Sequence, residues 1–84
     1  MFQNYIVEVK KYHNGEFEHN VFWAYDQDEE QARLKAESKY HTILADAAVS
    51  NTAEHSAILF SSKGYPRMYQ CYTHKQPEEV SANE

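Results

Sequence analysis

The chain has 84 residues, which is enough for one domain and too few for two. Its net charge of −5 disfavours generic binding of duplex nucleic acid, because such binding needs a basic face. Hydrophobic residues make up 42% and charged residues 25% of the chain, a profile typical of an ordinary globular domain. The aromatic share of 14%, with seven tyrosines, is high for a protein of this size.

The chain shows no pattern for membrane insertion or export. No apolar run approaches the roughly 20 residues that a membrane-spanning helix needs. The first residues lack the basic start and the apolar run of a signal peptide. The single cysteine, Cys71, excludes an internal disulfide and fits a reducing compartment. We therefore expect a cytoplasmic protein without membrane association.

The strongest local pattern lies in residues 4–25, where two β-rich runs flank Asn14-Gly15. Asn and Gly tolerate the positive φ that both central residues of a type I′ turn require, so the pair predicts a two-residue β-hairpin turn. Counting outward from that turn pairs Ile6 with Trp23. Because side chains alternate across a strand, this register divides the hairpin between two faces.

One face, which pairs Val7 with Phe22, is compact and apolar and predicts a core. The other is too aromatic to stay in water without a reason. The two faces could exchange roles, but one helix covers only one of them. The exposed aromatic residues could shelter one another, mediate self-association, or bind a ligand or partner protein. The predicted interface consists of Ile6, Tyr12, Phe17, Val21, Trp23 and Tyr25.

Residues 26–50 predict the only long helix. Asp26 is a suitable N-cap, and Glu29 three residues later completes a pattern like a capping box. Asn51 is predicted to end the helix in the left-handed conformation. Apolar residues recur at helical spacing and form one stripe that would pack on the sheet. The stripe consists of Ala32, Ala36, Tyr40, Ile43, Leu44 and Ala47.

Residues 56–62 and 67–74 predict a second hairpin, with Lys63-Gly64 at its tip and Pro66 where its second strand begins. A turn on Lys63-Gly64 again divides the large side chains between two faces. One face would carry Ile58, Phe60, Tyr69 and Cys71, and the other Leu59, Met68, Gln70 and Tyr72.

The order of these elements predicts an α+β fold of ββαββ type. Its simplest assembly is a four-stranded, mainly antiparallel sheet with one helix packed on one face. Residues 1–74 would form this single domain. Residues 75–84 contain three glutamates and one proline, and they predict a disordered acidic tail.

The potentially reactive residues form no recognisable catalytic or metal-binding motif, so we expect no metal, no cofactor and no enzymatic activity. The five histidines show neither HxH nor HxxxH spacing and are predicted to be scattered on the surface. Cys71 is predicted to be a buried strand thiol, and two glycines are too few for a glycine-rich phosphate loop. A small hydrolase that uses histidine and carboxylates is retained as an alternative.

The tip of the second hairpin combines two cations with an aromatic ring, in Lys63, Tyr65 and Arg67. Such a group can stack on a base and contact a phosphate, although it is also typical of an ordinary polar turn. Acidic residues of the helix and the tail could imitate nucleic-acid phosphates. The basic residues of the helix interrupt that pattern.

The runs YIVEVKKYHNGEF and SAILFSSKGYPRMYQCY, on either side of an Ala-bearing helix, resemble short ββαββ open reading frames of tailed phages and prophages. The likeness covers about residues 4–74. It implies a phage-encoded accessory protein in the host cytoplasm, which is virion-associated or disables a host component such as a defence enzyme or its nucleotide signal. The residues that carry the likeness are Tyr5, Val7, Val9, Asn14, Gly15, Gly64, Tyr69 and Tyr72.

Together these patterns predict a small non-catalytic binding protein that inhibits or sequesters a host protein or nucleotide signal stoichiometrically, as counter-defence proteins do. We expect it to form a homodimer or higher homo-oligomer through its open sheet face. The alternatives are a structural accessory protein, for instance of a virion, and a small hydrolase.

Overall fold

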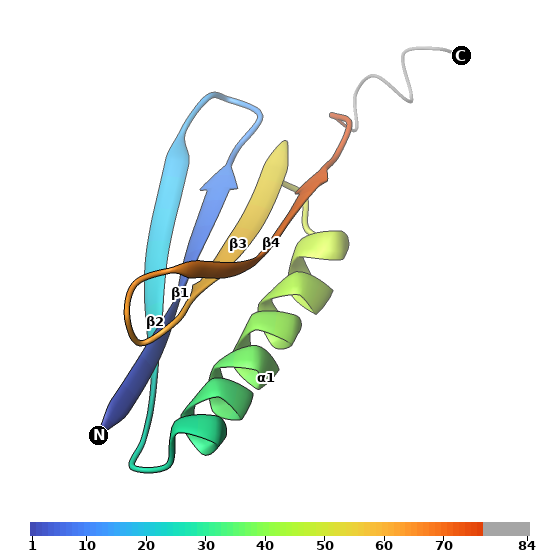
Figure 1. Cartoon of the computed structure of the whole chain (residues 1–84). Coiled ribbons are helices and arrows are strands. Elements are labelled where there is room, and N and C mark those ends of the chain that lie inside the picture. Colours follow the sequence, from blue (N-terminus) through green and yellow to red (C-terminus); the bar gives the residue numbers. More distant parts are fainter. Residues whose placement is uncertain (77–84) are drawn as a thin grey trace.

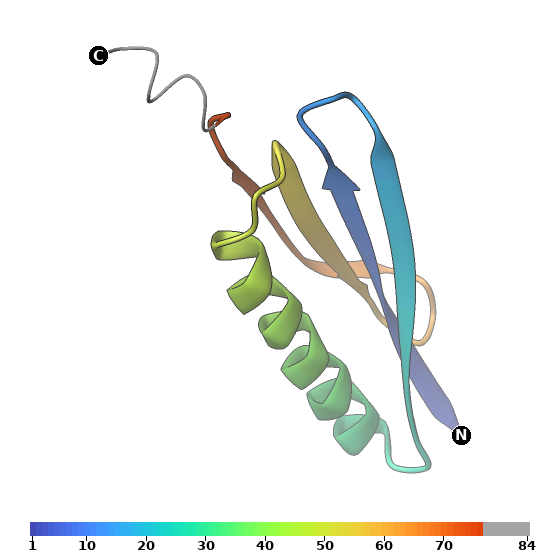
Figure 2. The same ribbon diagram turned by 180° about the vertical axis from the view of Figure 1, so that it is seen from behind.

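The computed structural model describes residues 1–76, so most of the predicted acidic tail lies outside the described residues. It confirms the ββαββ fold: four antiparallel strands form an open sheet in the order β2-β1-β3-β4. In the described part of the chain, one helix lies along one face of this sheet and nothing covers the other (Figures 1 and 2). The elements are β1 (Phe2–Lys11), β2 (Phe17–Asp26), α1 (Glu29–Ala48), β3 (Glu54–Phe60) and β4 (Pro66–Thr73).

The turn of the first hairpin differs from the predicted type I′ turn. The N–H of Tyr12 donates to the carbonyl of Glu16 at 2.8 Å, and the N–H of Gly15 donates to the carbonyl of Tyr12 at 2.9 Å. Gly15 has a φ of 92°, but no other kind of residue in the described chain has a positive φ, so Asn14 does not. These features indicate a three-residue loop, in which a type I turn is followed by a left-handed glycine.

The longer loop moves the register of the first hairpin by one residue. Ile6 pairs with Phe22 rather than with Trp23, and it is completely buried beneath α1. The prediction that Ile6 belongs to the exposed face is therefore wrong. A slip of one residue turns a strand over, so Val7, which was predicted for the core, lies on the uncovered side instead, together with Val9.

The second hairpin has the same turn but keeps its predicted register. Ser61 and Tyr65 close its tip with a 2.8 Å backbone hydrogen bond, and Gly64 has a φ of 86°. The three-residue turn by itself would shift the pairing by one residue, as it does in the first hairpin. A β-bulge at the end of β3 shifts the pairing back, so Ile58 pairs with Tyr69 as predicted. The predicted division of this hairpin between two faces is confirmed.

The helix begins and ends differently from the prediction. Asp28, not Asp26, is the N-cap, and its side chain accepts the N–H of Gln31 at 2.9 Å. Asp26 instead accepts the N–H of Asp28 at 2.9 Å and so shapes the turn before the helix. At the other end Val49 is the C-cap with a φ of −118°, and Asn51 is not left-handed.

The core lies between α1 and one face of the sheet. The predicted apolar stripe of α1 is buried except for Leu44, which is half-buried. Small alanines in the first half of the stripe let the helix approach the sheet closely. No helix within residues 1–76 has the length and apolar character needed to cross a membrane. The buried core residues are Ile6, Ala36, Tyr40, Ile43, Ala57 and Leu59.

Candidate functional site

The side of the sheet opposite α1, here called the open face, carries large apolar side chains from all four strands. Phe17 is 58% exposed, and Trp23 and Tyr25 on the same strand are each about half exposed, at 49% and 48%. A contiguous exposed patch of this kind marks an interaction site more often than single exposed residues do. Its apolar members are Tyr5, Val7, Val9, Phe17, Val21, Trp23, Tyr25, Ile58, Phe60 and Tyr69.

A row of aromatic rings crosses the middle of the open face. The ring of Tyr5 stacks on Phe60 with centroids 4.8 Å apart, and it meets Trp23 at 4.9 Å with an interplanar angle of 41°. This packing shelters the inner members of the row, as cross-strand aromatic pairs commonly do. The outer end, at Trp23, still faces solvent on β2. Mutual shelter therefore accounts for only part of the aromatic surface.

β2 is an edge strand, so within residues 1–76 one side of its backbone has no neighbouring strand. In an antiparallel ladder, residue pairs that exchange backbone hydrogen bonds alternate with pairs that do not. Because Tyr12 is hydrogen-bonded to Glu16, the even-numbered residues of β2 are the ones that bond to β1. Odd-numbered residues from Phe17 to Tyr25 consequently direct their N–H and C=O groups away from β1. The Nζ of Lys35 lies 3.4 Å from the carbonyl oxygen of Tyr25, as expected for an outward carbonyl.

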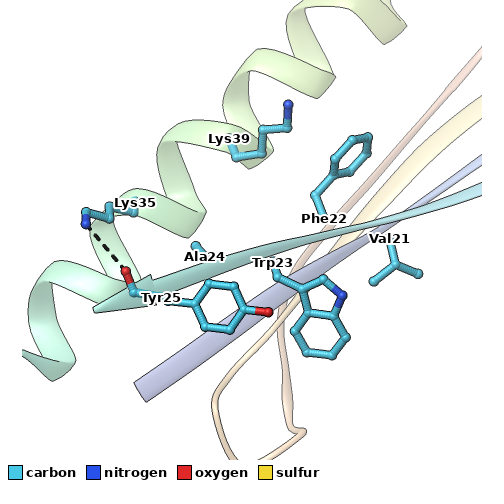
Figure 3. A pocket seen from close by; sticks show the side chains of 7 residues that line it. All are labelled: Val21, Phe22, Trp23, Ala24, Tyr25, Lys35 and Lys39. Atoms are coloured by element: carbon cyan, nitrogen blue, oxygen red, sulfur yellow. Dashed lines mark hydrogen bonds between the residues drawn. The ribbon is translucent and has the colours of Figure 1, made fainter. Parts of the chain in front are cut away.

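A groove runs between the free edge of β2 and α1, and we call it the edge groove. Its floor is formed by residues 21–25, and Lys35 and Lys39 of α1 flank it (Figure 3). Figure 3 shows Phe22 directed toward the helix and Trp23 directed to the opposite side of the strand. The Nζ of Lys39 lies 4.4 Å from the centre of the Phe22 ring, and the Nζ of Lys35 lies 2.8 Å from Asp26 Oδ2. The unpaired edge is therefore bordered by two cations.

A buried polar cluster lies near the end of α1. His55 Nε2 is 2.5 Å from Glu8 Oε2, and His55 Nδ1 is 3.2 Å from Ser50 Oγ. His55 is only 2% exposed, so its prediction as a scattered surface histidine is wrong. Its alternation with Ala57 and Leu59 along β3 was a sequence signal for burial.

The order Ser50, His55, Glu8 bears on the hydrolase alternative, because nucleophilic hydrolases join a hydroxyl, an imidazole and a carboxylate. Such a nucleophile also needs access for substrate and donors for the developing oxyanion. Here Ser50 Oγ also donates to the carbonyl of Ala47 at 3.2 Å, which completes the end of the helix. Neither the edge groove nor a second, polar depression beside the first turn of α1 borders the cluster. The geometry therefore favours a structural role, in which the cluster joins β1, β3 and α1.

Tyr12 does not belong to the open face as predicted. Its hydroxyl donates to Glu18 Oε1 at 2.7 Å, and Glu18 also accepts from the Asn20 amide. Asn20 in turn contacts the buried Glu8 at 3.3 Å, which places this group on the helix side of the sheet. The bond to Tyr12 lowers the pKa of Glu18, and the same bond raises the pKa of Tyr12.

The three predicted ligand contacts at the second hairpin tip do not form one site. Arg67 borders a shallow polar depression together with Glu29 and Glu30 of the first helical turn. Lys63 and Tyr65 do not line this depression, and both are exposed. Arg33 also lines the depression, so two carboxylates offset the two guanidinium groups and the lining has no excess of positive charge to attract a phosphate.

The remaining reactive residues are dispersed. Within residues 1–76 no group of three histidine, cysteine or carboxylate side chains is arranged to hold a metal ion. Cys71 is a half-buried thiol on the open face rather than the fully buried one predicted. Its proximity raises the pKa of the neighbouring Tyr69.

No family model, curated protein or solved structure matches this chain. The resemblance to phage reading frames therefore stays a prediction from the sequence. Among the features described above, the open face and the free edge of β2 are the strongest candidates for function.

Proposed function

We propose that this is a small non-catalytic binding protein that associates with itself and occludes a partner stoichiometrically. The observation that carries the proposal is the open face, where an aromatic row ends in the half-exposed Trp23 beside an unpaired strand edge. Trp and Tyr are the residues that most often dominate binding energy at interfaces, because they bury large area at small entropic cost.

The partner class that fits best is a host protein or a nucleotide signal, in a phage-encoded counter-defence role. A flat row of aromatic rings can accept an apolar protein surface or stack on a base. The net charge of −5 disfavours long nucleic acids, whose binding requires many phosphate contacts. Phage origin and a host target rest on the resemblance alone.

A structural accessory protein, for instance of a virion, is the second candidate. The free edge of β2 favours it, because unpaired strand edges support ordered assembly. The two candidates differ in stoichiometry: a binding protein forms a closed oligomer, whereas an assembly component continues to add copies as its concentration rises.

The self-association is tested by light scattering at micromolar concentration, with Trp23→Ser/Tyr25→Ser as the variant. We expect the wild-type protein to be a dimer or larger and the double variant to have a smaller mass. Leu34→Ser is the matched control, because Leu34 is an exposed apolar residue on α1, outside the open face. A monomeric wild-type protein whose Trp23 emits like a solvated indole would reject the proposed self-association.

A thermal-shift screen with cyclic and ADP-ribose-type nucleotides tests the nucleotide version. A ligand at about 100 times its Kd stabilises a protein by about 2.7 kcal/mol, and Trp23→Ser should abolish that shift. If no nucleotide raises the melting temperature, sequestration of a nucleotide is wrong and a protein target is the remaining partner.

A further inference from the structure

We infer that two copies of this chain pair edge to edge through their β2 strands, antiparallel and centred on Val21, to form one eight-stranded sheet. The inference rests on the self-association proposed above and specifies its geometry. Pairing at the edge leaves most of each open face uncovered. The two open faces then join into one continuous surface that is available to another partner.

The first support is that β2 is a long edge strand without a proline or a bulge. Within residues 1–76 its outward backbone groups pair with no strand, although the carbonyl of Tyr25 accepts a hydrogen bond from Lys35. The side chains beside these groups are Phe17, His19, Val21, Trp23 and Tyr25. Edge strands that must stay single usually carry lysine, proline or a bulge at such positions. The opposite edge, β4, begins with Pro66 and pairs with β3 through a bulge, so it is the protected edge.

The second support is the register that this edge allows. Only odd-numbered residues have free N–H and C=O groups, so two β2 strands can exchange hydrogen bonds only where odd residues face odd residues. Centring on Val21 satisfies this rule and pairs Trp23 with His19 of the second copy. The neighbouring permitted registers are centred on Asn20 and on Phe22. The first pairs only residues 17–23, and the second brings the two acidic residues Glu18 and Asp26 opposite each other within the paired strands. The register centred on Val21 pairs residues 17–25 and leaves its one opposed acidic pair, Glu16 and Asp26, just beyond them.

The third support is charge complementarity at the edge groove. In the register centred on Val21, Glu18 of the second copy faces Ala24 on the helix side of the sheet. Lys35 and Lys39 flank the groove on that side. The carboxylate thus approaches a groove bordered by two ammonium groups, of which Lys35 already pairs with Asp26 and Lys39 pairs with no carboxylate among the described residues. The two-fold axis repeats the contact in the other copy.

Cysteine cross-linking tests the register in full-length protein that carries Cys71→Ser. Directly paired antiparallel residues have Cα atoms about 5.5 Å apart, within the range that a disulfide spans. Val21→Cys should therefore give a covalent dimer under mild oxidation. His19→Cys alone should not give a covalent dimer, because position 19 faces position 23 of the second copy and the two substituted positions are therefore four residues apart along the paired strands. A mixture of His19→Cys and Trp23→Cys should cross-link again.

A pair of lysine substitutions tests the edge without a covalent link. Val21→Lys should weaken dimerisation at least about tenfold, because each copy places a charge where the two strands meet. Tyr69→Lys is the matched control on the β4 edge, and it should leave the oligomeric state unchanged. Both side chains are exposed, so circular dichroism should show that both variants fold.

The outcomes separate the two proposals. A wild-type dimer that Val21→Cys fails to cross-link, or that only Tyr69→Lys dissociates, overturns pairing through β2 and leaves the self-association proposal intact. A wild-type monomer at high micromolar concentration overturns both. Cross-linking of Val21→Cys and of the mixed cysteine variants, but not of His19→Cys alone, supports the register centred on Val21.

Discussion

The two hairpins of this protein end in the same turn and yet differ in their register. Both tips place a glycine in the left-handed region, Gly15 at 92° and Gly64 at 86°. In the β3–β4 hairpin a bulge compensates for the turn, whereas the β1–β2 ladder runs without a bulge. Turn chemistry therefore predicts that a hairpin forms, but the faces of its strands depend on how the ladder accommodates the loop.

The outer strands of the two hairpins differ in how they meet solvent. β4 carries a proline and a bulge, and Arg67 follows the proline. β2 has neither proline nor bulge, and it places Trp23 and Tyr25 beside its free backbone groups. Natural sheets seldom leave a long apolar edge unprotected, and this contrast is the reason that we propose pairing at the β2 edge rather than at the β4 edge.

The largest change in the free energy of unfolding is expected for a histidine on the inner strand β3, compared with a histidine on the outer strand β2. His55→Ala on β3 removes one partner of the buried contact with Glu8, and it should lower the free energy of unfolding by about 3–5 kcal/mol. His19→Ala on β2 is the matched variant and should change it by less than about 0.5 kcal/mol, because His19 is exposed. Urea unfolding measures both, and equal effects would contradict the structural role of the cluster.

An intermediate effect tests whether the two turns are alike. Gly15→Ala and Gly64→Ala should each cost about 1–2 kcal/mol in urea unfolding, because both glycines are left-handed. An added Cβ meets nothing within 4 Å at Gly15 and only the Tyr5 hydroxyl at 3.9 Å at Gly64, so the cost is conformational.

The Asn14→Gly variant distinguishes the observed turn from a type I′ turn. Asn14 has a negative φ, so glycine there should destabilise the protein by roughly 0.5–1 kcal/mol through the entropy of the unfolded chain. The variant also loses the hydrogen bond that Asn14 Oδ1 accepts from the N–H of Glu16 at 3.0 Å, which acts in the same direction. A stabilising effect would instead indicate positive φ at this position and a two-residue turn.

The smallest expected effect on stability is the pH-dependent contribution of Asp26, at the junction of β2 with α1. The hydrogen bond from Lys35 and, next, the backbone N–H of Asp28 lower the pKa of Asp26 below its ordinary value of 3.8. Because the folded-state pKa is lower than the unfolded one, the stabilisation is complete above 3.8 and is lost as the pH falls through the folded-state value. Melting temperatures of the wild type and Asp26→Asn should therefore converge in acid. A difference between the two melting temperatures that persists unchanged into acid would contradict this prediction.

The sequence by itself determined the order of the elements, the buried stripe of α1 and the faces of the second hairpin. Each depends on local physical chemistry, namely helical spacing in the case of Ala36 and Tyr40, and strict alternation in the case of Ile58 and Leu59. The exposed Trp23 and Tyr25 follow from the same alternation along β2. Helical spacing and strand alternation involve only residues that are close in the sequence, so both can be predicted without knowledge of long-range contacts.

Only the tertiary structure decided which side of β1 faces the helix. Two-residue and three-residue loops both accommodate Asn14-Gly15, and burial of Ile6 beneath α1 selects the longer one. The contact between Glu8 and His55 spans 47 positions, so no local pattern could pair them. The free edge of β2 is likewise a property of the strand order, because a strand becomes an edge only when the whole sheet assembles.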